Sequence, residues 1–354
     1  MTIRLILIIL SILCLSGCVE SHVIDDINII SAVGYDKSEE GKVMGTTIIP
    51  VYEADKSITN ESFSAEATQS KAILRKMQQK SSDPLVNGSI EVVLFGRDKA
   101  EEGVIEIVDT LERDPNIGSN IMMAVVDGKA QEILQEQLGN RGTGTYLFNL
   151  LENNMTRREL PRSNLHLFLF SYYSKGRDPS LPYIKLEGNK VNIKGMAIFT
   201  DDKVTSYVDD SKMFFYKALM ENFKNGSYTL EVDQEYATIY SLTLDRKYDI
   251  KNTMSNPKVH ITVTLEGHIR EYSGKRLESK SLRKIEAAFE KLIKDNCETL
   301  LNEFKDKGSD PVGIGLMAKT QTRHFDEKKW KEAYKNATFH VNAKVIISET
   351  GIVE

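Results

Sequence analysis

The chain has little cysteine and little tryptophan. Its 354 residues include three cysteines and one tryptophan, and the formal net charge is only −5. Cys14 lies in an apolar leader and Cys18 directly follows it, so that Cys297 is the one cysteine of the body. A body with a single cysteine cannot form an intramolecular disulfide, which excludes a small disulfide-stapled secreted fold. Stability must come from a packed core.

The sequence also lacks a strong charge excess and, past residue 18, any long apolar run. Without basic blocks the chain is not a typical nucleic-acid-binding protein. No later apolar run approaches the roughly 20 residues that a membrane-spanning helix needs. A chain of 354 residues exceeds the usual size of one domain and can bury a sizeable core. We therefore expect two or three domains that form a soluble ectodomain.

The first eighteen residues have the layout of a secretory signal. Arg4 precedes an apolar run from Leu5 to Leu13, and the small residues Ser16 and Gly17 stand directly before the cysteine. The apolar run is too short to span a membrane, so we expect a removable leader over residues 1–17. An ordinary signal peptide with an incidental cysteine is the alternative.

The stretch "LSGC" at residues 15–18 resembles the bacterial lipoprotein box. In that box the cysteine thiol receives a diacylglycerol, the leader is removed, and acyl groups such as palmitate are carried on the new N-terminus. Two acyl chains on one residue make stable anchoring possible, at about 0.8 kcal/mol per buried methylene. The resemblance implies that Cys18 is lipidated and tethers the body to a membrane.

Strand and helix patterns alternate up to about residue 190. The runs "INIISAVGYD" and "KVMGTTIIPVYEA" predict strands, whereas "KAEEGVIEIVDTLERD" and "TGTYLFNLLENNMT" predict helices. The run "NLHLFLFSYYS" is apolar on both faces of an extended chain, which predicts a central strand with His166 as a core histidine. We expect an N-terminal α/β domain over residues 18–140 and a middle segment over residues 141–190.

Residues 191–354 predict a C-terminal α+β domain. The run "KVNIKGMAIFTDDKVTSYVD" indicates a hairpin that turns at Asp201-Asp202, and three further strand candidates predict a largely antiparallel sheet. From Ser279 to Lys307 apolar residues recur every three or four positions, which predicts a long packed helix ended by Gly308. The predicted fold is α+β with three semi-independent domains, and mixed sheets with helices make up the first half.

No catalytic or metal-binding set is recognisable in the sequence. Neither Gly-x-Ser-x-Gly nor His-Glu-x-x-His occurs. His260 and His268 lie about 26 Å apart on a straight strand and cannot share a metal ion. Cys297 lies on the apolar stripe of the long helix, so we expect a buried structural thiol. We expect no enzyme, no cofactor and no metal.

Several other polar or glycine-rich stretches have plain structural interpretations. The glycines of "GNRGTGTY" and of "GIG" at 313–315 favour turns over a phosphate-binding loop, because no Walker spacing follows. Adjacent acidic pairs, such as Glu101-Glu102 and Asp209-Asp210, favour solvated charge. "MTRRELPR" predicts an exposed connection. The alternative is that this loop faces an anionic bilayer, where each arginine would add roughly 1 kcal/mol to the binding free energy. The arginines are Arg157, Arg158 and Arg162.

Three stretches in order resemble the C-subunit lipoproteins of bacterial spore germinant receptors, the Ger(x)C family. "IDDINIISAVGYD" is similar to the family's opening strand, and "GMAIFTDDKVTSYVDD" to its hairpin with an acidic turn. A third stretch, from residue 310, carries the family's Asp-Pro-hydrophobic-Gly-x-Gly, its tryptophan and its closing glycine. The residues that carry the resemblance are Gly34, Asp36, Asp310, Pro311, Gly313, Gly315, Trp330 and Gly351. Val19 departs from the tryptophan that the family often has there.

The resemblance implies a non-enzymatic, lipid-anchored subunit of a nutrient sensor on the outer face of the spore inner membrane. It implies assembly with a membrane-embedded A subunit and an integral B subunit, a role in nutrient-triggered germination, and a three-domain α+β fold. Whether the subunit contacts the nutrient stays open. A solute-binding lipoprotein of a transporter is the alternative, which would need two doubly wound lobes. An anchored enzyme would need a pocket with converging titratable groups.

Overall fold

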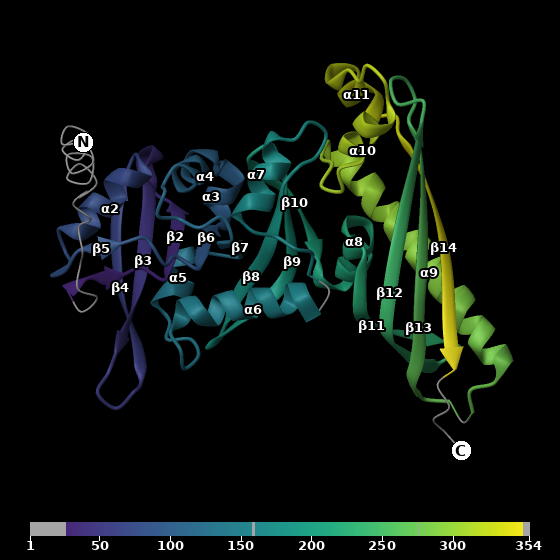
Figure 1. The fold of residues 1–354 in the computed structure, drawn as a ribbon, viewed down its shortest axis with the longest axis horizontal. Coiled ribbons are helices and arrows are strands. Elements are labelled where there is room, and N and C mark those ends of the chain that lie inside the picture. The colour runs from purple at the N-terminus through teal and green to yellow at the C-terminus, as the bar shows by residue number, and fades with distance from the viewer. Residues whose placement is uncertain (1–25, 158–159, 275, 350–354) are drawn as a thin grey trace, which may run out of the picture.

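The computed structural model of the chain describes residues 26–157, 160–274 and 276–349. Two sheets of different kinds lie one after the other along the long axis of the molecule (Figure 1). The first sheet has eight strands and the second has four. The fold is α+β, as predicted.

The eight-stranded sheet has the order β10-β9-β8-β7-β6-β2-β3-β4. Its four central strands, β2, β6, β7 and β8, run parallel, and antiparallel strands extend it on both sides. The strands are β2 (Ala32–Lys37), β3 (Val43–Tyr52), β4 (Ile58–Ala67), β6 (Val92–Gly96), β7 (Met122–Val126), β8 (Ser180–Glu187), β9 (Lys190–Thr200) and β10 (Lys203–Asp209). A separate parallel pair joins β1 (Asn28–Ile29) to β5 (Leu85–Val86).

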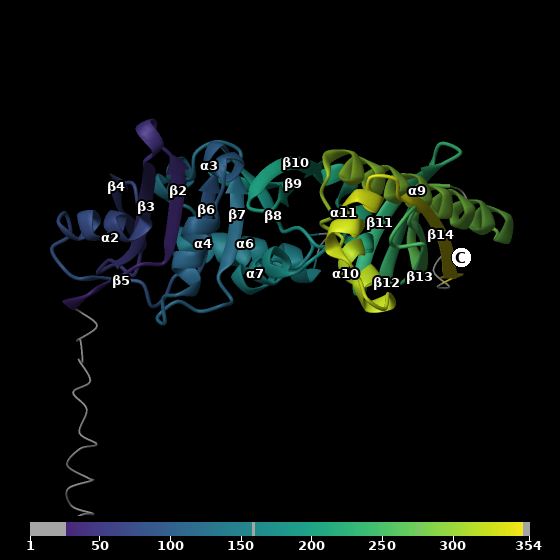
Figure 2. The same ribbon diagram turned by 90° about the horizontal axis from the view of Figure 1, so that it is seen from above.

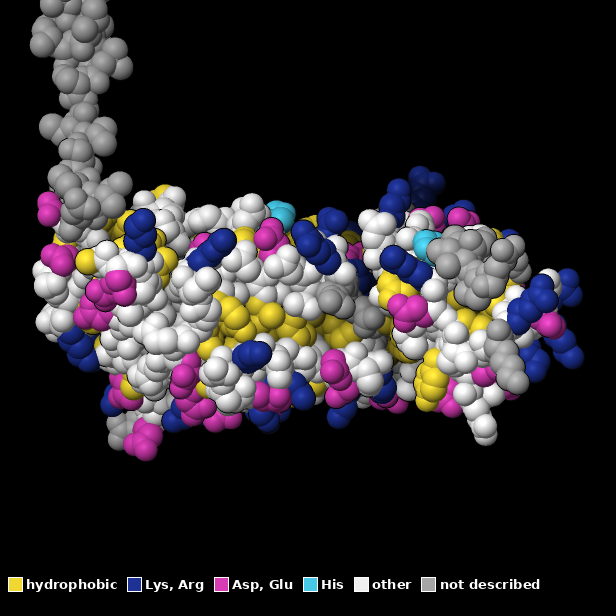
Figure 3. Space-filling view, turned by 90° about the horizontal axis from the view of Figure 1, so that it is seen from below, with side chains coloured by type: hydrophobic (Ala, Val, Ile, Leu, Met, Phe, Trp, Pro, Cys, Tyr) yellow, Lys and Arg dark blue, Asp and Glu magenta, His cyan; other side chains and the backbone are white. Residues whose placement is uncertain are grey.

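Helices cover both faces of this sheet because its central strands are apolar on both sides. Val93 and Val125 point into one core, with α2 (Ser70–Gln78), α3 (Arg97–Glu102), α4 (Ile105–Glu112) and α7 (Leu165–Tyr173). Leu94 and Val126, their chain neighbours, point into the other core, with α5 (Ala130–Gln135) and α6 (Thr143–Arg157). Seen from below, an apolar band crosses the middle of the surface (Figure 3).

The four-stranded sheet has the order β11-β12-β13-β14 and carries one long helix. The first three strands are antiparallel, and β13 and β14 are parallel. The strands are β11 (Phe223–Val232), β12 (Glu235–Lys251), β13 (Lys258–Tyr272) and β14 (Thr338–Glu349). The helices of this half are α8 (Met213–Met220), α9 (Ser279–Lys307), α10 (Ile314–Gln321) and α11 (Glu327–Tyr334). Two short 3-10 turns are η2 (Glu39–Gly41), between β2 and β3, and η3 (Asp210–Lys212), before α8.

The predicted long helix is confirmed to the residue as α9. Gly308 ends it in the left-handed conformation, with φ 72°, and its N–H donates to the carbonyl of Lys305. Ile285, Phe289, Ile293 and Leu300 bury one stripe against the sheet.

Three glutamates of α9 cover the outer edge of β14. Glu298 accepts from the N–H of Val341 at 2.9 Å, Glu290 from Val345 at 3.0 Å, and Glu286 from Ile347 at 2.9 Å. The spacing fits because four helix residues rise about 6 Å and two strand residues about 6.6 Å. Backbone groups that an edge strand would otherwise offer to another chain are thereby occupied.

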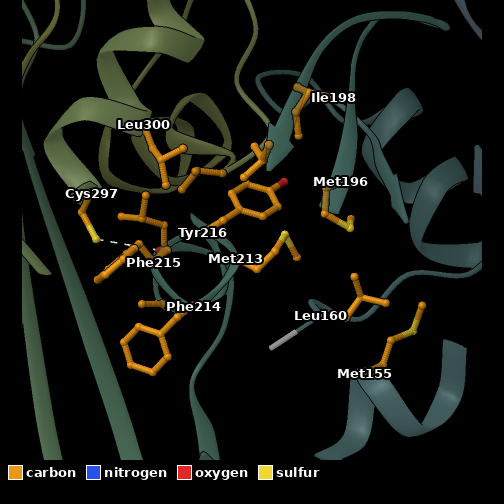
Figure 4. Packing of buried hydrophobic residues seen from close by; sticks show 14 of the residues in the cluster. Met155, Leu160, Met196, Ile198, Met213, Phe214, Phe215, Tyr216, Cys297 and Leu300 are labelled. Carbon is orange, nitrogen blue, oxygen red and sulfur yellow. Dashed lines mark hydrogen bonds between the residues drawn. The ribbon is translucent and has the colours of Figure 1, made fainter. Parts of the chain in front are cut away.

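Helix α8 joins the two sheets through one buried cluster. Met213 and Tyr216 lie between Met196 and Ile198 of β9 on one side and Leu300 of α9 on the other (Figure 4). The Nζ of Lys217, 5% exposed, donates to the carbonyls of Met155 and Leu160, both at 3.1 Å. The core is therefore continuous from the first sheet to the second.

Helix α7 corrects the predicted central strand over "NLHLFLFSYYS". The side chain of Asn164 accepts from the N–H of Leu167 at 2.8 Å and caps the helix. A short run that is apolar throughout has no period, so periodicity cannot distinguish a strand from a helix. His166 was wrongly expected in the core: it lies exposed on α7.

The first sheet extends past the boundary that we expected at about residue 190. That boundary falls at the start of β9, which pairs antiparallel with β8, and the hairpin of β9 and β10 completes the eight-stranded sheet. A short connection favours pairing between consecutive strands, which is why the hairpin stays with the strand before it. The break between the two sheets therefore comes after Asp209.

Candidate interaction site at the junction of the two halves

The Asp-Pro-Val-Gly-Ile-Gly turn begins α10 with a buried carboxylate. Oδ1 of Asp310 accepts from the N–H groups of Gly313 and Ile314, both at 2.9 Å, and Oδ2 accepts from Gly315 at 2.7 Å. These bonds satisfy N–H groups that the first turn of a helix leaves without partners. The spacing of the aspartate and the glycines therefore serves a helix start.

Gly315 also lets the turn approach the first half of the molecule. A Cβ on Gly315 would lie 2.5 Å from Nε1 of Trp330 and 2.8 Å from the Cα of Gly176. Gly176 belongs to the loop between α7 and β8, and its carbonyl accepts from the N–H of Leu316 at 2.8 Å. Two backbones are thus in direct contact where the halves meet.

A second aspartate, Asp178, adds two hydrogen bonds to this contact. The N–H of Asp178 donates to the carbonyl of Asp310 at 2.9 Å, and the N–H of Asp310 donates to Oδ2 of Asp178 at 2.6 Å. Burial raises the pKa of Asp310 to about 7, against the lowering effect of its N–H donors. Burial also raises the pKa of Asp178. Both carboxylates accept from backbone N–H groups, which positions the chain rather than a substrate.

A cleft of about 950 Å³ opens beside this contact. Its walls come from the end of α7, the loop that follows, the β9–β10 turn and α11. Lys175 crosses it to pair with Glu327 at 3.0 Å. Acidic and basic side chains line it together, so the cleft has no strong charge of one sign.

Gly34 and Asp36 lie in β2, toward the edge of the first sheet at which its parallel strands end. The carboxylate of Asp36 accepts from the N–H groups of Ala130 and Gln131 at 2.7 and 2.9 Å, at the start of α5. A Cβ on Gly34 would lie 2.8 Å from the Cβ of Ala130. Burial raises the pKa of Asp36. The chain's own carboxylate thus occupies a helix start at the carboxyl ends of parallel strands, where other α/β proteins bind anions.

A polar cluster next to Asp36 joins the start of α3 and the residue after β7 to β8 and β10. Arg97 pairs with Asp127 at 3.1 Å, and Lys185 pairs with the same carboxylate at 3.0 Å. The guanidinium carbon lies 5.5 and 5.2 Å from the ring centres of Tyr183 and Tyr207. Burial alone would raise the pKa of Asp127, but hydrogen bonds and the charge of Arg97 lower it. The cluster therefore holds a charged carboxylate.

The other residues singled out in the sequence have structural positions. Cys297 is fully buried, as predicted, and burial raises the pKa of its thiol. Asp202 is bound rather than solvated: its carbonyl accepts from the N–H of Val104 and its Oδ2 from Ile105, at the start of α4. Arg162 lies exposed, 4.0 Å from Glu221. Cys18, Arg158 and Gly351 lie outside the described residues.

The structure brings together two histidines that the sequence keeps far apart. His260 of β13 and His340 of β14 pair in register, with ring centres 5.2 Å apart, whereas His268 pairs with Ser348. Among the described residues no group of three or more His, Cys, Asp or Glu side chains is placed to hold a metal ion. None of the helices in the described part of the chain is long and apolar enough to cross a membrane.

Sequence reasoning missed Gly176, Asp178 and Lys217. The two loop residues carry no local signal, because their partners lie more than a hundred positions away. Lys217 did carry a local signal, because it is the one charged residue within the apolar run "MFFYKALM". A charge at such a position is buried only with partners.

Each half of the chain matches a family model of known proteins. A family model described as "Spore germination protein N-terminal domain" matches residues 20–186, and one described as "Spore germination B3/ GerAC like, C-terminal" matches residues 194–351. The chain is 30% identical over 357 residues to spore germination protein GerQC of Bacillus cereus, and the match covers 99% of each protein.

Two further comparisons agree with these. The chain is 22% identical over 305 residues to the putative spore germination protein YfkR of Bacillus subtilis strain 168, covering 82% of this chain and 79% of that protein. The crystal structure of the GerBC protein matches with a TM-score of 0.60 at 15% identity, over 89% of this chain and 96% of that one. At that identity the likeness shows the fold.

Proposed function

The chain belongs to the Ger(x)C family of spore germination proteins, and we propose that it is the lipid-anchored C subunit of a nutrient germinant receptor. The observation that carries the proposal is the match of the whole chain to GerQC together with family models for both halves. The subunit works on the outer face of the spore inner membrane and is required for nutrient-triggered germination.

The membrane anchor in this proposal is a diacylglyceryl group on Cys18. Support comes from the sequence: a short apolar leader, small residues before the cysteine, and a body with no other free thiol than buried Cys297. Two acyl chains on one residue give an anchor that one chain does not give.

The subunit acts through protein contacts with an A and a B subunit rather than through catalysis. In support, the carboxylates of Asp310 and Asp36 accept backbone N–H groups and hold the chain in place. The alternative of a solute-binding lipoprotein needs two lobes with parallel sheets. In the described residues the second sheet is antiparallel apart from β14, which disfavours that alternative.

A pull-down from spore membranes tests the assembly. The tagged full-length protein, solubilised in mild detergent, should recover A-type and B-type subunits in comparable amounts. The control is a tagged lipoprotein of the same membrane from another family. Recovery of transporter subunits instead would replace this proposal with the solute-binding alternative.

Replacing Cys18 with alanine tests the anchor. The Cys18→Ala protein should leave the inner membrane fraction, and spores that rely on this receptor should lose germination by nutrient but keep chemically forced germination. Cys297→Ala is the matched control, since that thiol is buried in the core. Unchanged nutrient germination in spores without a redundant receptor would contradict the proposal.

A further inference from the structure

We propose that the protein rests on the lipid bilayer with helix α7 and the edge of the first sheet at which the parallel strands begin. The inference rests on the proposed anchor at Cys18 and adds which surface meets the lipid. The exposed side of α7, which carries Phe170 and Tyr173, is called the α7 surface. Its proposed occupant is the bilayer and not a protein.

Helix α7 exposes two large aromatic side chains on the surface of the molecule. Leu165, Phe168 and Leu169 are buried against the sheet. On its exposed side lie His166, Phe170, which is 46% exposed, and Tyr173, which is 59% exposed. Two aromatic rings three residues apart are thus open to solvent, beside one histidine.

The described chain begins at the same edge of the sheet. Ser31, just before β2, accepts through its carbonyl from Glu91, and the carbonyl of Glu91 accepts from Met122, so the starts of β2, β6 and β7 lie in one row. Helix α7 begins on that row, because the N–H of Leu165 donates to the carbonyl of Ile121. In Figure 2 the start of β1 beside β5 and helix α7 lie along the same side of the molecule, the lower side of the view.

The length of chain before Asn28 keeps this edge close to the membrane. Ten residues lead from Cys18 to Asn28, and a fully extended chain of that length reaches at most about 36 Å. The edge that carries Asn28 and α7 is therefore the part of the body that the anchor holds nearest to the lipid. The opposite edge, with Asp36 and Arg97, faces away from it.

The chemistry of the α7 surface suits the headgroup region. Tyrosine and phenylalanine favour the boundary between water and acyl chains. Arg113, with a side chain 72% exposed, and Lys175, 63% exposed, stand beside Tyr173 and just after it. Both are already paired, with Asp109 and Glu327, so the aromatic rings and not the charges carry the contact.

Tryptophan fluorescence of the lipidated full-length protein in vesicles of phosphatidylglycerol and phosphatidylethanolamine tests this inference. The chain has one tryptophan, Trp330, which is 2% exposed and supplies a constant background. Phe170→Trp places a reporter on the α7 surface. Its emission should shift to the blue and fall about twofold in vesicles whose acyl chains carry bromine, because an interfacial side chain reaches the acyl boundary.

Tyr236→Trp is the matched control, because Tyr236 is 52% exposed on β12 of the second sheet. Its emission should not respond to brominated lipid. Emission from Phe170→Trp that is unquenched while the protein floats with the vesicles overturns the inference and leaves the anchor intact. A protein that stays in the aqueous fraction overturns the anchor and the inference together.

A second variant tests the same surface without a reporter. Phe170→Ser with Tyr173→Ser changes only exposed side chains and should lower the residual vesicle binding of the Cys18→Ala protein. Unchanged binding counts against the inference. Shielding of the Phe170→Trp reporter from an aqueous quencher only when A and B subunits are added would assign the surface to a protein partner and overturn the lipid contact.

Discussion

Gly176 and Gly315 touch backbone to backbone across the junction of the two halves: a Cβ built on Gly176 would lie 2.6 Å from the carbonyl carbon of Gly315. No side chain can be accommodated at that distance without moving main chain. Next to this contact, two hydrogen bonds join Asp178 to Asp310.

Gly315→Ala should therefore destabilise the protein. The new methyl group would press on Trp330 and on the main chain of Gly176, and overpacking of this kind costs about 1–3 kcal/mol. Denaturant unfolding measures the loss. Gly118→Ala is the control, because nothing lies within 4 Å of the Cβ it would gain. Equal stability of the two variants would show that the junction yields.

Asp310 should make stability depend on pH in the direction opposite to an ordinary aspartate. Its folded-state pKa is about 7, whereas an unfolded aspartate titrates near 3.9. Between about pH 4 and pH 7 the folded protein therefore holds more protons than the unfolded chain, and the contribution of Asp310 to the free energy of unfolding falls as pH rises.

The measurement compares wild type with Asp310→Asn from pH 4 to pH 8. The free energy of unfolding of wild type, minus that of the variant, should decrease up to about pH 7 and then level off. A difference that grows with pH would mean that the three N–H donors outweigh burial and keep the carboxylate charged.

Glu290→Ala should weaken the covered edge of β14. The N–H of Val345 loses its acceptor, which costs about 1–3 kcal/mol and leaves an edge on which another chain can pair. Unfolding and light scattering together report both effects. Glu303→Ala is the control, since Glu303 makes only an exposed pair with Lys212.

Lys294→Gln should strengthen the covered edge of β14 and raise the free energy of unfolding. Position 294 lies midway between Glu290 and Glu298, so the register of the three glutamates places it opposite Ala343. A glutamine oxygen there can accept the N–H of Ala343, for a gain of about 0.5–1 kcal/mol. A loss of stability in this variant would disprove the matched register of helix and strand.

Lys217→Met should separate the halves more easily. The substitution leaves the carbonyls of Met155 and Leu160 without their donor and removes the nearer of two basic partners of Glu221, at a cost of about 3 kcal/mol. Differential scanning calorimetry should show a lower transition temperature. Lys212→Met, at an exposed pair, should change it little.

The sequence was a good guide where the cause of a structure is local. A repeated apolar stripe and a glycine with positive φ define α9, and two aspartates at a turn define the hairpin of β9 and β10. The apolar run of α7 misled because it has no period. The contact between Asp178 and Asp310 was out of reach, since it joins positions 132 residues apart and a single sequence gives no sign of which distant residues meet.

The unbroken core through α8 has a mechanical consequence. Because Met213 and Tyr216 are packed on both sides, bending the molecule at that point would expose apolar surface to water. The elongated body therefore moves as one stiff unit. In the lipid-anchored subunit that we propose, a small tilt of the first sheet would carry the second sheet through a larger displacement.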